Sequence, residues 1–152
     1  MDFISEWLPF RDSAELTGIT PRLENSASAP LFGHTCPAGF PSPAQDYIEK
    51  TLDLNEYCVR HPSATYYVRA LGDSMAESGI QSGDLLVVAR SLRPQHNSIV
   101  IASVESEFTV KRLCLHPRLC LMPMNPAYSP IYVSPDELEI FGVVTHSVHD
   151  FL

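Results

Sequence analysis

From Thr65 to the C-terminus, apolar and polar residues alternate in short runs that are separated by turn-forming residues. A period of two is typical of β-strands that bury one face. Only Glu105 and Ser106 separate two of these runs, which predicts a tight hairpin, although the turn lacks the glycine that such turns favour. The pattern predicts a mainly β, curved and mostly antiparallel fold. Its expected strands are residues 66–71, 85–89, 99–104, 107–115, 118–122, 131–133 and 139–148.

Two short helices are predicted ahead of the strands. Ser42 with Gln45 and Asp53 with Glu56 each have the spacing of a capping box, in which side chains satisfy main-chain N–H groups at the start of a helix. The expected helices are residues 42–50 and 53–60.

The chain before these helices has a different character. Residues 1–38 carry five acidic and two basic side chains, and they include a small-residue stretch at 25–30 that has little reason to fold. This segment is too short for a helix-turn-helix domain with a linker. We therefore expect a flexible N-terminal arm over residues 1–38 and one β domain over residues 39–152.

Prolines surround the pair Ala38 and Gly39. Pro37, Pro41 and Pro43 bias the residue before each of them toward an extended conformation. An extended segment with two small residues suits either a hinge or a peptide that a protease cleaves. The residues alone favour the hinge.

The chain has 18 acidic and 10 basic residues, which gives a formal net charge of −8. Such a protein is a poor direct ligand for DNA phosphates, so we expect no strong DNA binding and any nucleic-acid role to run through protein partners. The sequence shows neither an apolar run long enough to span a membrane nor the features of a signal peptide. We therefore expect a cytoplasmic protein that makes no contact with membranes.

Four cysteines, at positions 36, 58, 114 and 120, form no CxxC pair. In a reducing compartment they are expected to be free thiols. Cys114, His116 and Cys120 lack a fourth ligand at a familiar spacing, so we expect neither a metal nor a cofactor.

The candidate chemistry lies at Ser74 and Lys111. Ser74 follows the first predicted strand in a Gly-Asp-Ser-Met bend, and Lys111 lies in a later strand. A serine hydroxyl becomes a good nucleophile when a base takes its proton, and a lysine can be that base once burial favours its neutral form. Alternation places Lys111 on the same side as the apolar Leu113. Taken alone, a serine in such a turn is more often a turn former, and a strand lysine is more often at the surface.

The flanking residues strengthen this interpretation. Gly72-Asp73-Ser74-Met75, residues 79–88 and residues 107–111 together resemble the self-cleaving LexA/UmuD superfamily of Ser-Lys peptidases. Residues 39–44, 46–47, 53–55 and 61–66 are similar to the UmuD/MucA branch in particular.

The resemblance implies autocleavage between Ala38 and Gly39, with Ser74 as the nucleophile and Lys111 as the base. Main-chain N–H groups at the Asp73–Ser74 bend would hold the oxyanion. UmuD has a cysteine before the matching glycine, whereas Ala38 agrees with MucA-like relatives and LexA. Cys36 lies two residues upstream and is not the cleavage residue.

The resemblance also implies partners and a purpose. UmuD-like proteins are homodimers that lose their arm when a RecA filament on single-stranded DNA promotes self-cleavage. The shortened form joins a Y-family polymerase subunit (UmuC-like) in error-prone synthesis past DNA lesions during the SOS response.

Four alternatives stay open at this point. One is a Ser-His site using a histidine at position 61, 96, 116, 146 or 149. The second is a leader-peptidase-type enzyme, which also uses a Ser-Met box and a Val-Lys-Arg strand. The third is a LexA-like or phage-type self-cleaving regulator, and the fourth is a non-catalytic dimeric scaffold.

Overall fold

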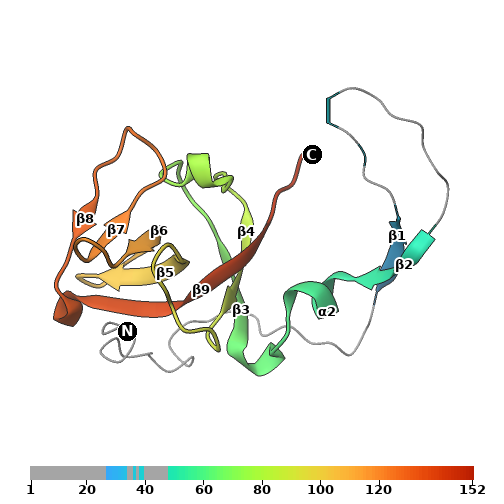
Figure 1. Ribbon diagram of the computed structural model, residues 1–152, viewed down its shortest axis with the longest axis horizontal. Coiled ribbons are helices and arrows are strands. Elements are labelled where there is room, and N and C mark those ends of the chain that lie inside the picture. Colours follow the sequence, from blue (N-terminus) through green and yellow to red (C-terminus); the bar gives the residue numbers. More distant parts are fainter. Residues whose placement is uncertain (1–26, 34–35, 37, 40–47) are drawn as a thin grey trace.

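The computed structural model describes residues 27–33, 36, 38–39 and 48–152 (Figure 1). Its main feature is a seven-stranded antiparallel sheet with the strand order β3-β4-β9-β5-β6-β7-β8. A two-stranded sheet of β1 and β2 stands apart from it and leads into it through α2 (Figure 1). The mainly β, antiparallel fold class is confirmed. The strands of the large sheet are β3 (Thr65–Arg69), β4 (Leu85–Ala89), β5 (Ile99–Val104), β6 (Glu107–Cys114), β7 (Cys120–Met122), β8 (Ile131–Tyr132) and β9 (Leu138–Val148).

All seven predicted strands are present. The bounds of β4 and β5 agree with the prediction, and the other strands differ by one or two residues at an end. The expected hairpin joins β5 to β6, and both turn residues have positive φ, 51° at Glu105 and 70° at Ser106. Positive φ at both central residues is the type I′ geometry that matches the twist of the strands. The turn therefore forms without its usual glycine.

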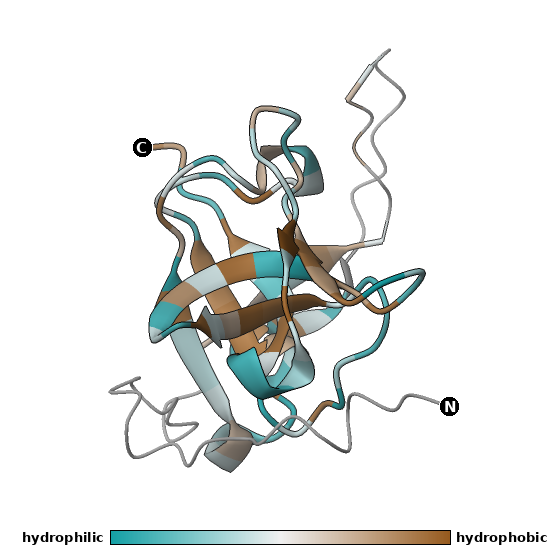
Figure 2. Ribbon diagram, turned by 90° about the vertical axis from the view of Figure 1, so that its left-hand side faces the viewer, coloured by the Kyte–Doolittle hydropathy of each residue, from teal (hydrophilic) through white to brown (hydrophobic). Residues whose placement is uncertain are grey.

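β9 holds the sheet together because it pairs with β4 along one part of its length and with β5 along the other. Each pairing contains a register shift, one between Val87 and Val88 and one between Ile101 and Ala102. Such bulges bend a strand and increase its twist. The bends let one long strand follow the curved sheet that Figure 2 shows.

The curvature creates two apolar cores on opposite faces of the sheet. Alternation along β5 sends Val100 and Ala102 into one core and Ile101 into the other. The first core is completed by Leu113, Leu119, Leu121, Leu138 and Ile140. The second core, formed by Tyr66, Ala70, Met75, Ile80, Leu86, Val88 and Phe141, supports the segment that carries Ser74.

The predicted helix at residues 53–60 is confirmed in a shorter form. α2 (Leu54–Cys58) begins at the Asp53 cap, whose carboxylate accepts a hydrogen bond from the Asn55 N–H at 2.8 Å. The other helical turns among the described residues are short 3-10 segments, η2 (Pro62–Ala64), η3 (Ala76–Ser78) and η4 (Pro135–Glu137). Within the described residues, no helix is long and apolar enough to cross a membrane.

The prediction of a helix over residues 42–50 was wrong at its end. Residues 48–50 belong to β2 (Ile48–Asp53), which pairs antiparallel with β1 (Ser28–Phe32). Residues 40–47 of that predicted helix lie outside the described part of the chain. The small-residue stretch at 25–30 was expected not to fold, yet Ser28 to Pro30 are part of β1. In both cases strand pairing supplies main-chain hydrogen bonds that local sequence preference does not reveal.

Candidate active site

Ser74 lies in the connection between β3 and β4, which is closed at its base by two main-chain hydrogen bonds. The Ala70 N–H donates to Asp84 O at 2.9 Å, and the Gly83 N–H donates to Ala70 O at 2.8 Å. Gly72 has a φ of 89°, which a residue with a side chain rarely adopts, and it allows the chain to turn just before Ser74. The buried side chain of Met75 then anchors the bend in the second core.

A second segment holds the bend from the other side. The Met124 N–H donates to Ser74 O at 2.7 Å, and the Asn125 amide donates to Asp73 O at 2.9 Å. The Tyr128 hydroxyl donates to the Asp73 carboxylate at 2.5 Å, which raises the pKa of that tyrosine. These contacts fix Asp73 and the turn that precedes Ser74.

Lys111 reaches Ser74 from β6. Its side chain is only 8% exposed, and its Nζ lies 3.0 Å from Ser74 Oγ. Leu113, two residues on, is fully buried, as alternation along the strand predicts. Burial lowers the pKa of Lys111, because loss of water destabilises the charged ammonium more than the neutral amine.

Three oxygen atoms lie around the Lys111 amine. Besides Ser74 Oγ, Nζ contacts Thr109 Oγ1 at 2.6 Å and Val110 O at 3.1 Å. A neutral amine has two N–H donors and one lone pair. The two N–H groups can serve Thr109 and Val110, which leaves the lone pair to accept the Ser74 hydroxyl proton. This arrangement is the one that a general base requires.

A cleft with a volume of about 200 Å³ opens over these two side chains. Its walls come from the end of β3, from β6 and from the Ile101 and Leu86 side chains. Phe108 forms part of the wall and is 57% exposed, and its ring packs against Phe141 with 4.8 Å between the ring centroids. The cleft is thus open to solvent, apolar at its sides and polar at its floor.

The structure brings together Ser74 and Lys111, but it leaves the other two predicted site residues elsewhere. Ala38 and Gly39 are exposed, and among the described residues the cleft lining comes from positions 68 to 111. In sequence, the pair lies between β1 and β2.

The histidines that could have formed a Ser-His site have other neighbours. His96 packs against His116, His146 lies against Tyr57, and His149 bonds to the buried Asp84 at 2.6 Å. The hydroxyl of Ser74 faces Lys111 instead. All four cysteines are free thiols, as predicted.

Thr109 was not singled out from the sequence, although its hydroxyl makes the shortest contact with the Lys111 amine. The signal was present in the alternation of Thr109, Val110 and Lys111, since residues two apart on a strand share a face. That spacing alone does not say which hydroxyl contacts the lysine, because the lysine side chain can adopt many rotamers.

Comparison with known proteins agrees with this geometry. Residues 30–145 match the family model described as Peptidase S24-like. The chain belongs to the peptidase S24 family. Protein SamA of Salmonella typhimurium is 59% identical over 123 residues, which cover 81% of this chain and 86% of SamA. Protein MucA of Escherichia coli is 56% identical over 123 residues, 80% of this chain and 84% of MucA.

These relatives place this S24 peptidase among the UmuD/MucA-type SOS mutagenesis proteins, as the resemblance predicted. The LexA repressor of Alcanivorax borkumensis is more distant, at 36% identity over 80% of this chain and 59% of the repressor. Family membership supports a self-cleaving serine peptidase in general terms.

Proposed function

We propose that this protein is a self-cleaving accessory subunit of an error-prone translesion DNA polymerase in the SOS response. In this proposal Ser74 and Lys111 form the catalytic dyad and cut the chain between Ala38 and Gly39. The observation that carries the proposal is the 3.0 Å contact between Lys111 Nζ and Ser74 Oγ, made by a lysine that burial shifts toward its neutral form.

The first half of the reaction follows from these positions. Ser74 Oγ attacks the carbonyl carbon of Ala38 while its proton passes to Lys111 Nζ. The carbonyl oxygen becomes an oxyanion, which the main-chain N–H groups of Asp73 and Ser74 can stabilise. Neither of these N–H groups donates a hydrogen bond to another group in the described part of the chain.

The second half returns the enzyme to its starting state. The bond between Ala38 and Gly39 breaks, and Lys111 gives its proton to the new amino group of Gly39. Water then attacks the ester on Ser74, Lys111 accepts a proton from that water, and the proton returns to Ser74 as the acid of Ala38 leaves. Each step uses the same lysine nitrogen, so no third catalytic residue is needed.

The position of Ala38 and Gly39 outside the cleft suggests how cleavage is controlled. The chain must visit a second conformation in which this segment lies over Ser74. A RecA filament on single-stranded DNA can act by favouring that conformation, without supplying any catalytic group.

The products suggest a change of partners. Residues 1–38 carry a net charge of −3, so their removal changes the formal charge of the chain from −8 to −5. In the proposal the shortened protein remains a homodimer and joins a Y-family polymerase subunit of the UmuC-like type. Both forms carry a net negative charge, so in the proposal the protein acts through protein partners rather than by binding DNA strongly itself.

The control step can be tested by incubating the purified protein with RecA, an ATP analogue and single-stranded DNA. We expect a fragment that begins at Gly39 to form faster than without the filament, and to be absent for Ser74→Ala. Equal rates with and without the filament would remove RecA from the proposal while leaving the dyad standing. Pull-down of a Y-family polymerase by the cleaved form, compared with the intact form, tests the partner.

A further inference from the structure

A second cavity lies on the face of β3 and β4 that is opposite the cleft over Ser74 and Lys111. It is found where α2 leads into the sheet. It has a volume of about 290 Å³. Its walls come from the end of α2, the start of β3, the end of β4 and the bulged part of β9. The residues that line it are Cys58, Arg60, His61, Thr65, Ala89, Ser91, Leu92, Thr145 and His146.

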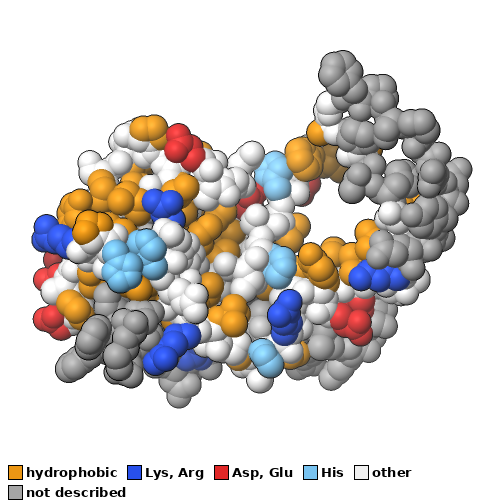
Figure 3. Space-filling model, in the orientation of Figure 1, with side chains coloured by type: hydrophobic (Ala, Val, Ile, Leu, Met, Phe, Trp, Pro, Cys, Tyr) orange, Lys and Arg blue, Asp and Glu red, His pale blue; other side chains and the backbone are white. Residues whose placement is uncertain are grey.

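The lining is rich in hydrogen-bond donors. Arg60, His61 and His146 contribute three basic side chains, and none of the lining residues is an aspartate, glutamate, asparagine or glutamine. This is unusual in a chain with 18 acidic and 10 basic residues. On the face seen in Figure 3, Lys or Arg and His side chains lie along the boundary between the sheet and α2.

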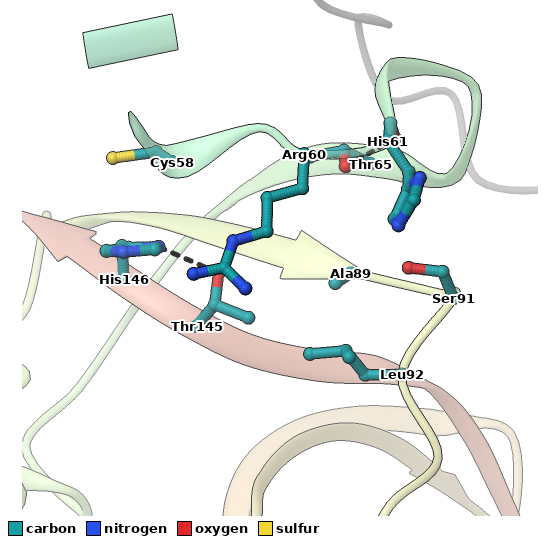
Figure 4. Close-up of a pocket in the computed structure, with 9 residues that line it drawn as sticks. All are labelled: Cys58, Arg60, His61, Thr65, Ala89, Ser91, Leu92, Thr145 and His146. Atoms are coloured by element: carbon teal, nitrogen blue, oxygen red, sulfur yellow. Dashed lines mark hydrogen bonds between the residues drawn. The ribbon is translucent and has the colours of Figure 1, made fainter. Parts of the chain in front are cut away.

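The basic groups also converge on one space. In Figure 4 the guanidinium of Arg60 extends toward Thr145 and His146, while the ring of His61 and the hydroxyl of Ser91 face the cavity from its other end. Within the described residues, Arg60 makes no hydrogen bond or ion pair through its side chain. A guanidinium presents a planar fork of donors that fits carboxylate and phosphate oxygens.

The hydroxyl and thiol groups that line the cavity add no negative charge to it. The Thr65 hydroxyl donates to His61 O at 2.8 Å, and the Thr145 hydroxyl donates to Val87 O at 3.3 Å. Burial raises the pKa of the Cys58 thiol, so Cys58 stays neutral and adds no negative charge. The cavity therefore presents positive and donor groups to whatever enters it.

We infer that this cavity is a binding site for an oxyanion, a phosphate or carboxylate group, which Arg60 holds together with His61 and His146. The apolar side chains of Leu92 and Ala89 can contact the uncharged part of a ligand that carries the anionic group. The inference does not depend on self-cleavage, because neither Ser74 nor Lys111 lines this cavity.

A contact with Thr145 orients the His146 ring. Its Nδ1 lies 2.9 Å from Thr145 Oγ1. Because the threonine hydroxyl donates to Val87 O, its oxygen can accept from Nδ1–H. The His146 ring lines the cavity and can contribute to holding an anion there. The titratable groups around this ring are Tyr57, which packs on it, and Cys58, Arg60 and His61 across the cavity.

The test is a titration of full-length Ser74→Ala protein, which stays intact, with inorganic phosphate and separately with N-acetylglutamate at constant ionic strength. Binding is followed by the NMR signals of the His61 and His146 rings. We expect saturable shifts of both ring signals with one or both probes at a fixed pH. Phosphate alone would assign the site to phosphate groups, and N-acetylglutamate alone to carboxylate groups.

Two variants that each remove one positive charge distinguish binding in the cavity from nonspecific electrostatic attraction of the anion to the protein. Arg60→Gln should weaken binding by about tenfold or more, because a charge-assisted hydrogen bond is lost. Arg93→Gln removes an exposed arginine that does not line the cavity, and it should leave binding nearly unchanged. Shifts that do not saturate with either probe, or equal losses in the two variants, would overturn the inference. Both arginines are exposed, and unfolding curves will show that the variants remain folded.

Discussion

At the scale of single residues, the central feature is the environment of the Lys111 amine. Three oxygen atoms surround Nζ within 3.1 Å, one each from Ser74, Thr109 and Val110. Burial favours the neutral amine. In that form its two N–H groups can donate to the Thr109 and Val110 oxygens, which leaves the lone pair for the serine hydroxyl. The Lys111 side chain therefore loses its proton more easily, and its amine is held next to the Ser74 hydroxyl.

Thr109→Val tests this orientation. The substitution keeps the size and branching of the side chain but removes the oxygen 2.6 Å from Nζ. We expect the maximal rate of self-cleavage to fall by about tenfold, the equivalent of one hydrogen bond worth about 1.4 kcal/mol. Thr109→Ser keeps the oxygen and should cleave at nearly the wild-type rate. Equal rates for all three proteins would mean that Thr109 does not position the lysine.

Lys111→Met tests the cost of burying the amine. Burial lowers the pKa of Lys111 in the folded protein, so the unfolded chain binds more protons in the pH range between the folded and unfolded pKa values. Stability therefore rises with pH across that range. Lys111→Met removes the buried charge, and the variant should have a higher free energy of unfolding than wild type below the folded pKa.

That advantage of Lys111→Met should shrink as the pH rises toward the ordinary range of lysine, about 10.4. Denaturant unfolding at several pH values measures it. Arg112→Met, on the opposite side of the same strand, is the matched control and should show no such trend. A stability difference for Lys111→Met that is independent of pH would contradict a lowered pKa.

At the scale of elements, periodicity located all seven strands of the large sheet but not the hairpin of β1 and β2. The seven strands are short apolar-rich runs separated by turn-forming residues, although the tight turn at Glu105 and Ser106 lacks the usual glycine. β1 contains Ser28, Ala29 and Pro30, which favour no strand by themselves, and it forms by pairing with β2. The helix predicted from Ser42 does not continue through residues 48–50, because these residues pair with β1.

The bulges of β9 could not be predicted from the sequence either. A bulge depends on which residues of two distant strands oppose each other, and β9 pairs with two partners. Gly142 lies next to the register shift in the pairing with β5. A Cβ there would lie 2.6 Å from Val88 Cγ1 and 3.1 Å from Ala89 O of β4. The glycine lets β4 and β9 approach closely.

Gly142→Ala should therefore destabilise the fold by about 1–3 kcal/mol, the usual cost of overpacking. The free energy of unfolding in denaturant measures this. Because the nearest atom belongs to Val88, the double variant Gly142→Ala with Val88→Ala should lose less than the sum of the two single losses. Strict additivity would show that the close contact with Val88 is not the cause.

At the scale of the whole molecule, the sequence predicted that Ser74 and Lys111 lie together but not where Ala38 and Gly39 would lie. Ser74 and Lys111 are fixed by a turn and a strand that both show in the sequence. In the proposed mechanism, cleavage requires a second arrangement of the chain, and the balance between two such arrangements would be set by many weak contacts. The structure describes an arrangement with this pair exposed and away from the cleft.

The most direct test of the account is the intact mass of the purified protein after incubation across a range of alkaline pH. Raising the pH deprotonates Lys111, so cleavage should accelerate and then level off below the ordinary pKa of lysine, about 10.4. We expect a single new fragment that begins at Gly39, and its complete loss in both Ser74→Ala and Lys111→Ala. No fragment from the wild-type protein, or a fragment that persists in either variant, would contradict a catalytic role for the Ser74–Lys111 pair.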